Sequence, residues 1–133
     1  MGALRKVGIS VIWPQPQEGV YGEALTGFIN ECRMTLNVHY SETANTECRM
    51  YESLGCGVPV ISEPVSMPAL FPPGEGVLYC ETPLDMAAAV RGLLANNGAE
   101  VVHLGARGHA MVHEHYTYRL RCEQLLDIVG KLT

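Results

Sequence analysis

The sequence predicts an α/β domain in which a parallel sheet of about four strands is flanked by helices and followed by a helical C-terminal tail. Short apolar runs alternate with longer helical patterns, as is typical of parallel strands joined by crossover helices. The chain has 133 residues, the size of one domain, and 47% of them are hydrophobic. This composition is sufficient for one core, so we expect a single domain over residues 1–133.

Four short segments rich in β-branched and apolar residues are predicted as strands. In chain order they are Lys6–Trp13, Met34–Tyr40, Val58–Ser62 and Val77–Cys80. Pro14 ends the first segment and Gly57 precedes the third, and both residue types interrupt regular structure. The strand, helix and strand within residues 34–62 fit one βαβ unit, so the predicted sheet is Rossmann-like.

Five segments show helical patterns. In chain order they are Gly22–Cys32, Thr43–Cys56, Thr82 to about Asn96, Glu100–Glu114 and Thr117–Leu132. The third begins with Thr82 at the N-cap, Pro83 at N1 and Asp85 at N3, and Asn97-Gly98 ends it. In the last segment, core spacing predicts a buried face made of Cys122, Leu125, Leu126 and Val129.

Charge and cysteine content exclude several classes of protein. The formal net charge is −5, with nine Lys and Arg, which leaves no basic surface for nucleic acid or an acidic membrane. No apolar run reaches the ~18 residues of a spanning helix. Five cysteines without a CxxC pair or a secretory segment indicate reduced thiols. We therefore expect a cytoplasmic protein without a nucleic-acid partner or a membrane span.

The segment Thr43–Cys56 carries the pattern most relevant to function. At ~100° per residue, one side of this helix gathers the residues expected to bury against the sheet: Ala44, Cys48, Tyr51 and Gly55, with Leu54 close by. Another side gathers Asn45, Arg49 and Glu52 at positions i, i+4 and i+7. The helix begins after a strand, at the sheet edge where parallel sheets bind ligands and helix N-termini attract anions. The alternative is an exposed helix face with a weak Arg49 to Glu52 ion pair.

A family resemblance adds to this pattern. The stretch LNVHYSETANTECRMYESLGCGVPVIS, residues 36–62, resembles the core of the group 1 glycosyltransferases of GT-B fold, and most of all their CgeB-like branch. Gly105–Gly108 and His115–Arg119 resemble the "AxxGR" and "HTYxxR" elements near the end of such domains. The resemblance implies the C-terminal, donor-binding domain of a glycosyltransferase, with a nucleotide-diphosphate sugar as substrate. We assign no other cofactor and no metal-ligating residues, and the sequence leaves a metal requirement open.

The resemblance also implies roles for single residues. Glu52 would accept hydrogen bonds from the ribose hydroxyls of the donor, because a diol offers two donors to one carboxylate. Arg49 would neutralise the diphosphate as charge develops on the leaving group, and it is our candidate catalytic residue. The remaining residues assigned to substrate binding are His39, Thr43, Asn45 and Thr46, with backbone N–H groups at the helix N-terminus contributing.

Two departures limit what the resemblance implies. Ala44 stands where many group 1 enzymes carry a second glutamate that contacts the donor sugar. A GT-B enzyme also needs an N-terminal domain that binds the acceptor, so we expect that domain or a partner chain to complete the site. The alternative function is a non-catalytic nucleotide-binding or protein-interaction module. A receiver-type domain is less consistent, because the expected acids at the strand ends are not evident.

The remaining motifs have structural interpretations. His109, His113 and His115 form an HxxxHxH pattern that could hold a metal, although a solvated helix face explains it better. Residues 74–76 (Gly-Glu-Gly) follow two prolines and are interpreted as a turn. Cys56 and Gly57 are interpreted as a small buried residue and a tight helix-to-strand turn.

Overall fold

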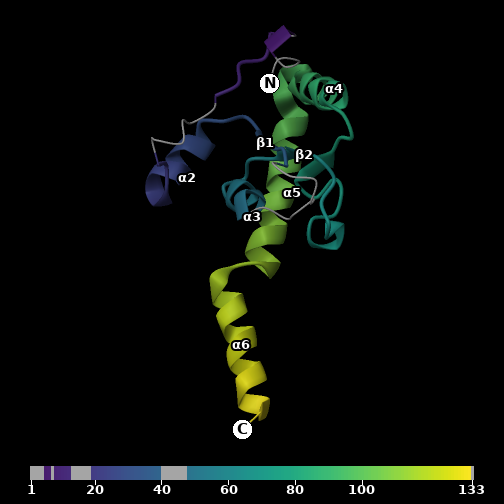
Figure 1. The fold of residues 1–133 in the computed structure, drawn as a ribbon. Helices are drawn as coiled ribbons and strands as arrows, with labels where there is room; N and C mark the ends of the chain where they lie inside the picture. The colour runs from purple at the N-terminus through teal and green to yellow at the C-terminus, as the bar shows by residue number, and fades with distance from the viewer. Residues whose placement is uncertain (1–4, 7, 13–18, 40–47, 133) are drawn as a thin grey trace.

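The computed structural model describes residues 5–6, 8–12, 19–39 and 48–132. Its elements are, in order, α2 (Gly22–Asn30), β1 (Thr35–Asn37), α3 (Cys48–Gly55), β2 (Val60–Ser62), the 3-10 turn η2 (Pro68–Leu70), β3 (Val77–Tyr79), α4 (Pro83–Leu94), the 3-10 turn η3 (Asn96–Gly98), α5 (Ala99–His115) and α6 (Tyr118–Leu132). In Figure 1, α5 runs through the body and α6 continues beyond it.

The three strands form one parallel sheet in the order β1-β2-β3. Thr35 pairs with Val60, and Val60 pairs with Val77. Helix α3 is the crossover between β1 and β2, and helices flank the sheet, so the predicted α/β class with a helical tail is confirmed.

The strand predicted over Lys6–Trp13 is wrong for the part that the structure describes. Residues 8–12 form no strand. Ile9 and Val11 nevertheless pack against the hydrophobic core. The apolar alternation therefore indicated burial correctly, but burial of side chains does not require the backbone to join a ladder.

Side chains from the two faces of the sheet enter two separate hydrophobic clusters. The α3 cluster contains Met50, Leu54, Val60, Val65, Phe71, Val77 and Val112. The α4 cluster contains Ile61, Cys80, Met86, Ala87, Val90, Leu93, Val101 and Leu104. Val60 and Ile61 are neighbours in β2 but enter different clusters, because successive strand residues point to opposite faces. Each fully buried side chain of this kind contributes about 1.5–3 kcal/mol of transfer free energy.

Two glycines let α5 approach the sheet closely. A Cβ atom at Gly105 would overlap the carbonyl oxygen of Gly57. A Cβ atom at Gly108 would lie 2.6 Å from Cδ2 of Leu54 and 2.8 Å from Cα of Gly76. Gly57 itself has a φ of 75°, as the predicted tight turn requires. The two glycines of the sequence element at residues 105–108 are therefore packing positions.

Local signals at both ends of α4 are confirmed. The Thr82 side chain accepts a hydrogen bond from the Asp85 backbone N–H at 3.2 Å, and Asp85 Oδ2 accepts from the Thr82 N–H at 3.1 Å. This capping box satisfies two N–H groups that an uncapped helix leaves unpaired. Asn97 and Gly98 both have positive φ angles, 57° and 74°, which end the helical course before α5 begins.

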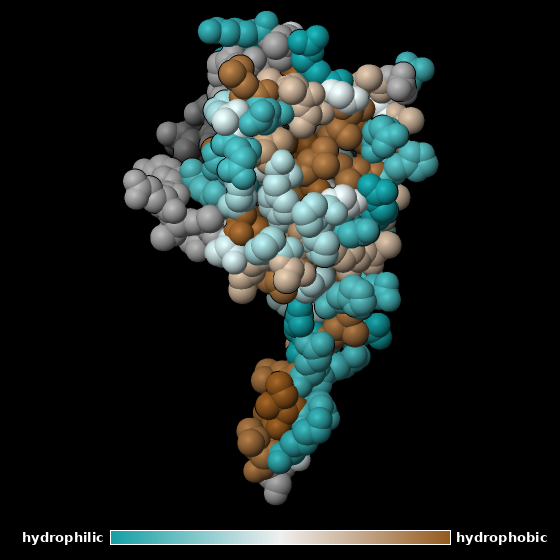
Figure 2. Space-filling view, turned by 90° about the vertical axis from the view of Figure 1, so that its right-hand side faces the viewer, coloured by the Kyte–Doolittle hydropathy of each residue, from teal (hydrophilic) through white to brown (hydrophobic). Residues whose placement is uncertain are grey.

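The core face predicted for the last helix is wrong. None of the residues of α6 is buried, and Leu125 and Leu126 are 60% and 71% exposed. Figure 2 shows apolar residues gathered along one side of this projecting helix. The spacing identified an apolar stripe, but the body of the domain does not extend far enough to cover it. Within the described part of the chain, no helix combines the length and apolar character needed to cross a membrane.

Candidate functional site

The carboxyl ends of β1 and β2 are joined by backbone contacts into one edge. The N–H of Glu63 donates to the carbonyl of Asn37 at 3.0 Å. The N–H of His39 donates to Oε2 of Glu63 at 2.7 Å. The Cys80 N–H, just past β3, donates to the Ser62 carbonyl at 2.8 Å. These contacts fix the edge at which open parallel sheets bind their ligands.

Buried polar side chains lie directly beneath this edge. Asn37 and Ser62 are completely buried, and Nδ2 of Asn37 donates to Oγ of Ser62 at 3.0 Å. Oγ of Ser62 donates in turn to the Glu63 carbonyl at 2.6 Å. Nδ2 of Asn37 also lies 3.6 Å from Sδ of Met50 in α3. The network ties the strand ends to the helix that carries the predicted site.

The buried face of α3 differs from the predicted one. Met50, Ser53 and Leu54 are buried, whereas Cys48 is exposed. Tyr51 is half-buried and packs on Phe71, with 4.6 Å between ring centroids. The helix is rotated so that its two largest aliphatic side chains, at positions i and i+4, enter the core.

Arg49 and Glu52 are both exposed on α3, as the predicted polar stripe requires. No ion pair joins these two described side chains, so the weak pair proposed as the alternative does not form. Thr43, Asn45 and Thr46 lie outside the described residues. His39 lies at the carboxyl edge, and no hydrogen bond links its side chain to Arg49 or Glu52.

Two histidines of α5 cap the C-terminus of α3. Nδ1 of His109 lies 2.8 Å and Nε2 of His113 lies 3.3 Å from the carbonyl oxygen of Gly55, the last residue of α3. The two rings are 4.1 Å apart. The last carbonyls of a helix lack partners within it, so this contact explains the histidine spacing. In the described part of the chain, no three His, Cys, Asp or Glu side chains are grouped as metal ligands.

The five cysteines form no disulfide, and Cys56, which follows α3, is a poor nucleophile. All five are free thiols, as predicted. Burial, with a smaller effect of the Glu52 carboxylate, raises the pKa of the Cys56 thiol. The thiolate is the reactive form, so Cys56 is held in its unreactive state at neutral pH.

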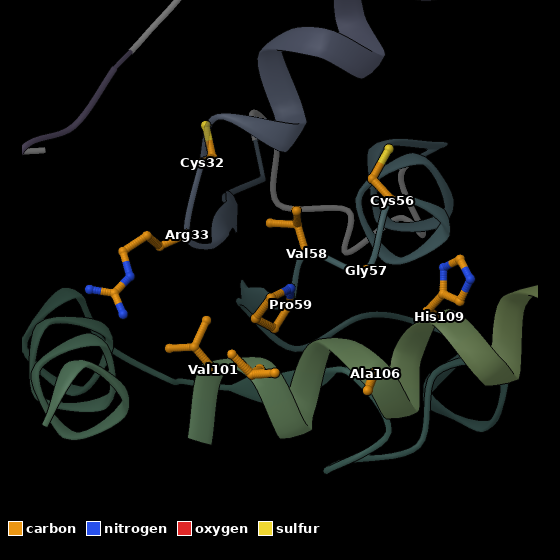
Figure 3. Close-up of a pocket in the computed structure, with 10 residues that line it drawn as sticks. Cys32, Arg33, Cys56, Gly57, Val58, Pro59, Val101, Ala106 and His109 are labelled. Atoms are coloured by element: carbon orange, nitrogen blue, oxygen red, sulfur yellow. The ribbon is translucent and has the colours of Figure 1, made fainter. Parts of the chain in front are cut away.

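An open pocket of about 580 Å³ lies at the opposite, amino-terminal edge of the sheet. Figure 3 shows residues 56–59 and helix α5 lining it, with Arg33 and His109 at its rim. The guanidinium of Arg33 donates to the Asn97 carbonyl at 3.2 Å. The lining is mainly apolar, and the parallel-sheet rule places ligands at the other edge, so we do not assign the site here.

Three residues of the carboxyl edge were not assigned to the site from sequence: Asn37, Ser62 and Glu63. A signal for Asn37 existed, because asparagine is disfavoured in a strand that is otherwise apolar. Glu63 directly follows the apolar strand β2, at the end where ligand-binding side chains cluster. Neither signal shows that the segment after β1 contacts the segment after β2, since that contact depends on strand order.

The fold is that of an α/β protein whose parallel strands end together at one edge, the edge at which such sheets bind ligands. A family model described as glycosyl transferase-like matches residues 3–127, and the chain therefore belongs to that family. Comparison with curated proteins and with solved structures gives no match. Family membership supports a transferase that acts in glycosyl transfer.

Proposed function

We propose that the chain binds a nucleotide-diphosphate sugar at the carboxyl edge, as the donor-binding C-terminal domain of a CgeB-like GT-B glycosyltransferase. The observation that carries this proposal is the exposure of Arg49 and Glu52 on the helix that follows β1, in a member of a glycosyl transferase-like family. Neither side chain is used by the core or by an ion pair between them, so both are available to a ligand.

The two side chains suit different parts of such a donor. Glycosyl transfer breaks the bond between the anomeric carbon and a diphosphate oxygen, and the same carbon bonds to an acceptor oxygen. Negative charge develops on the departing diphosphate, where the fork of the Arg49 guanidinium can donate two hydrogen bonds. The Glu52 carboxylate can accept from both ribose hydroxyls. The donor is a substrate, and this scheme needs no further cofactor.

The proposal includes a partner and a compartment. The acceptor site and the group that takes the acceptor proton come from an N-terminal domain or a partner chain, because the active site of a GT-B enzyme lies between two domains. The free thiols are typical of the reducing cytoplasm.

The first test is calorimetric titration of the chain with UDP, GDP and ADP. We expect one diphosphate to bind, and Glu52→Ala to weaken its binding at least about tenfold, the effect of losing a charged hydrogen bond. Glu123→Ala on α6 removes a carboxylate of the same size far from the edge and is the matched control. Equal affinity of wild type and Glu52→Ala would exclude the assigned role of Glu52, and binding of none of the three would exclude the proposal.

Arg49 is tested by comparing a diphosphate with its nucleoside. Arg49→Ala is expected to weaken binding of the diphosphate and to leave the nucleoside unaffected, because the nucleoside has no charge for the guanidinium to neutralise. If Arg49→Ala weakens the binding of both ligands to the same extent, Arg49 has a role in the fold and does not bind the diphosphate.

The exposed apolar side of α6 favours a second candidate, a non-catalytic interaction module. The two functions differ in turnover. Release of free diphosphate from a sugar nucleotide, measured with the wild-type chain and the separate acceptor domain, supports the transferase. Tight nucleotide binding with no release in the presence of that domain supports the module.

A further inference from the structure

The orientation of the Asn37 side chain amide is fixed by its neighbour. The Ser62 hydroxyl hydrogen points to the Glu63 carbonyl oxygen, so toward Asn37 it presents only a lone pair. The Asn37 atom that faces it is therefore the Nδ2 donor, and a flipped amide would set two acceptors against each other. Oδ1 of Asn37 is left as an acceptor, buried and without a hydrogen-bond partner among the described residues.

The tautomer of His39 is fixed in the same way. Nε2 of the ring lies 2.9 Å from the carbonyl oxygen of Pro64, which can only accept. The hydrogen of the neutral ring is therefore on Nε2, and Nδ1 carries a lone pair. Nδ1 is also buried and has no partner within the described part of the chain.

Two buried acceptors that lack a partner in the described part of the chain and belong to residues 37 and 39 are exceptional. A buried acceptor without a partner costs about 1–3 kcal/mol, and most buried polar atoms are paired. Asn37 and His39 are two positions apart at the carboxyl end of β1. A destabilising feature concentrated at the ligand edge of a sheet is explained by a ligand that supplies the missing donors.

The chemistry of the edge specifies what that ligand group is. Asn37 Oδ1, His39 Nδ1 and the Glu63 carboxylate are all acceptors, and no cationic side chain joins them in their described hydrogen bonds. Acceptors repel phosphate oxygens and accept hydrogens from hydroxyl groups. Both buried atoms are shielded from water, so a hydroxyl group that reaches them would form strong hydrogen bonds.

We propose that Asn37 and His39 bind the hydroxyl groups of the donor's glycosyl unit, and that Arg49 on α3 binds the phosphates. This inference rests on the proposed function. It assigns the specificity for a polyol to atoms at the end of β1. It also predicts that changes at Asn37 and His39 leave the affinity for the free nucleotide diphosphate unaffected.

The test compares three matched ligand pairs by calorimetry: UDP-glucose with UDP, GDP-mannose with GDP, and ADP-glucose with ADP. His39→Gln is the main variant, because its side-chain amide can still donate to Pro64 while the acceptor at the Nδ1 position is lost. We expect His39→Gln and Asn37→Ala each to weaken the binding of one sugar nucleotide at least tenfold. The affinity for the corresponding free diphosphate should change by less than twofold. Circular dichroism checks the fold of each variant.

Other outcomes overturn the inference in distinguishable ways. If a variant weakens the binding of the sugar nucleotide and of the diphosphate equally, or weakens neither, Asn37 and His39 do not recognise the sugar. The proposed function stands in that case. If the wild type binds no diphosphate or sugar nucleotide, the proposed function and this inference both fail.

The ¹⁵N resonances of the His39 ring provide a second measurement that does not depend on a variant. The wild type should show the tautomer with hydrogen on Nε2, and the Nδ1 resonance should shift on adding the sugar nucleotide but not the free diphosphate. Hydrogen on Nδ1, or an equal response to both ligands, would overturn the assignment.

Discussion

Helices α5 and α6 follow each other in the chain and have similar lengths, 17 and 15 residues, yet they have opposite fates. Val101, Leu104 and Val112 of α5 are buried in the two clusters, whereas α6 buries no residue. Both have apolar stripes of helical spacing. The comparison teaches that periodicity locates a helix and its apolar side, while coverage of that side depends on elements elsewhere in the chain.

The break between the helices accounts for the difference. Tyr116 ends α5 with φ −129° and ψ 17°, and its ring packs against Tyr51 and Phe71 at the limit of the α3 cluster. Beyond this point, Arg121 lies 5.0 Å above the Tyr116 ring, a contact that links α6 to the body.

The largest expected effect comes from truncating equivalent leucines in the two helices. Leu104→Ala is expected to lower the free energy of unfolding by about 2–5 kcal/mol, because Leu104 is only 3% exposed and its loss leaves a cavity. Leu126→Ala, at 71% exposure, should change it by less than about 0.5 kcal/mol. Urea denaturation measures both, and similar losses would mean that α6 is packed in solution.

Adding a methyl group at a glycine should change the free energy of unfolding in opposite directions in α5 and α6. Gly105→Ala forces a Cβ against the Gly57 carbonyl and should cost about 1–3 kcal/mol. At Gly130 in α6, an added Cβ would meet no heavy atom within 4 Å apart from its chain neighbours and the backbone of its own helix, so Gly130→Ala should stabilise by about 0.5–1 kcal/mol through helix propensity. Thermal unfolding of both variants checks the signs, and stabilisation by Gly105→Ala would refute the close approach of α5.

The smallest expected effect is a pH dependence of stability that arises from Cys80, a buried thiol of the α4 cluster. Burial, with a lesser effect of Asp85, raises the pKa of the Cys80 thiol from its ordinary 9.0. The stabilisation from this group is fully present below pH 9 and is lost as pH rises through the raised pKa. Unfolding midpoints should fall between pH 7 and pH 10, and fall less in Cys80→Ala.

Cys122→Ala is the control for that measurement, because Cys122 lies on exposed α6. The unfolding midpoint of Cys122→Ala should decline with pH as that of the wild type does. Burial raises the pKa values of Tyr51 and Tyr79 as well, so part of the decline should persist in Cys80→Ala. An identical decline in Cys80→Ala and wild type would show that the Cys80 thiol titrates normally in the fold.

Much of the fold could be predicted because local chemistry determines it. The Thr82-Pro83-Leu84-Asp85 start of α4 and the Asn97-Gly98 break act through neighbouring backbone atoms, and both are confirmed. The strand predicted from Lys6 was wrong because joining a sheet requires a partner edge, which no local pattern specifies. The buried face of α6 was wrong for a related reason, since its stripe has no facing surface.

The candidate site was predictable only in part. The exposed side of α3 with Arg49 and Glu52 follows from helical spacing, and that exposure is confirmed. The roles of these residues remain predictions. The contacts of Asn37 with Ser62, and of His39 with Glu63 and Pro64, cross 24 or 25 positions in the chain and depend on β1 lying beside β2. Such contacts arise from topology rather than from any short motif.

The pair of imidazoles on the Gly55 carbonyl holds the C-terminal end of α3 against α5. At 1.5 Å of rise per residue, Glu52 lies about 4.5 Å and Arg49 about 9 Å along the axis from Gly55. A small tilt of α3 about that point therefore moves Arg49 about twice as far as Glu52. The carboxylate proposed for the ribose therefore lies nearer to the held end of α3 than the guanidinium proposed for the diphosphate.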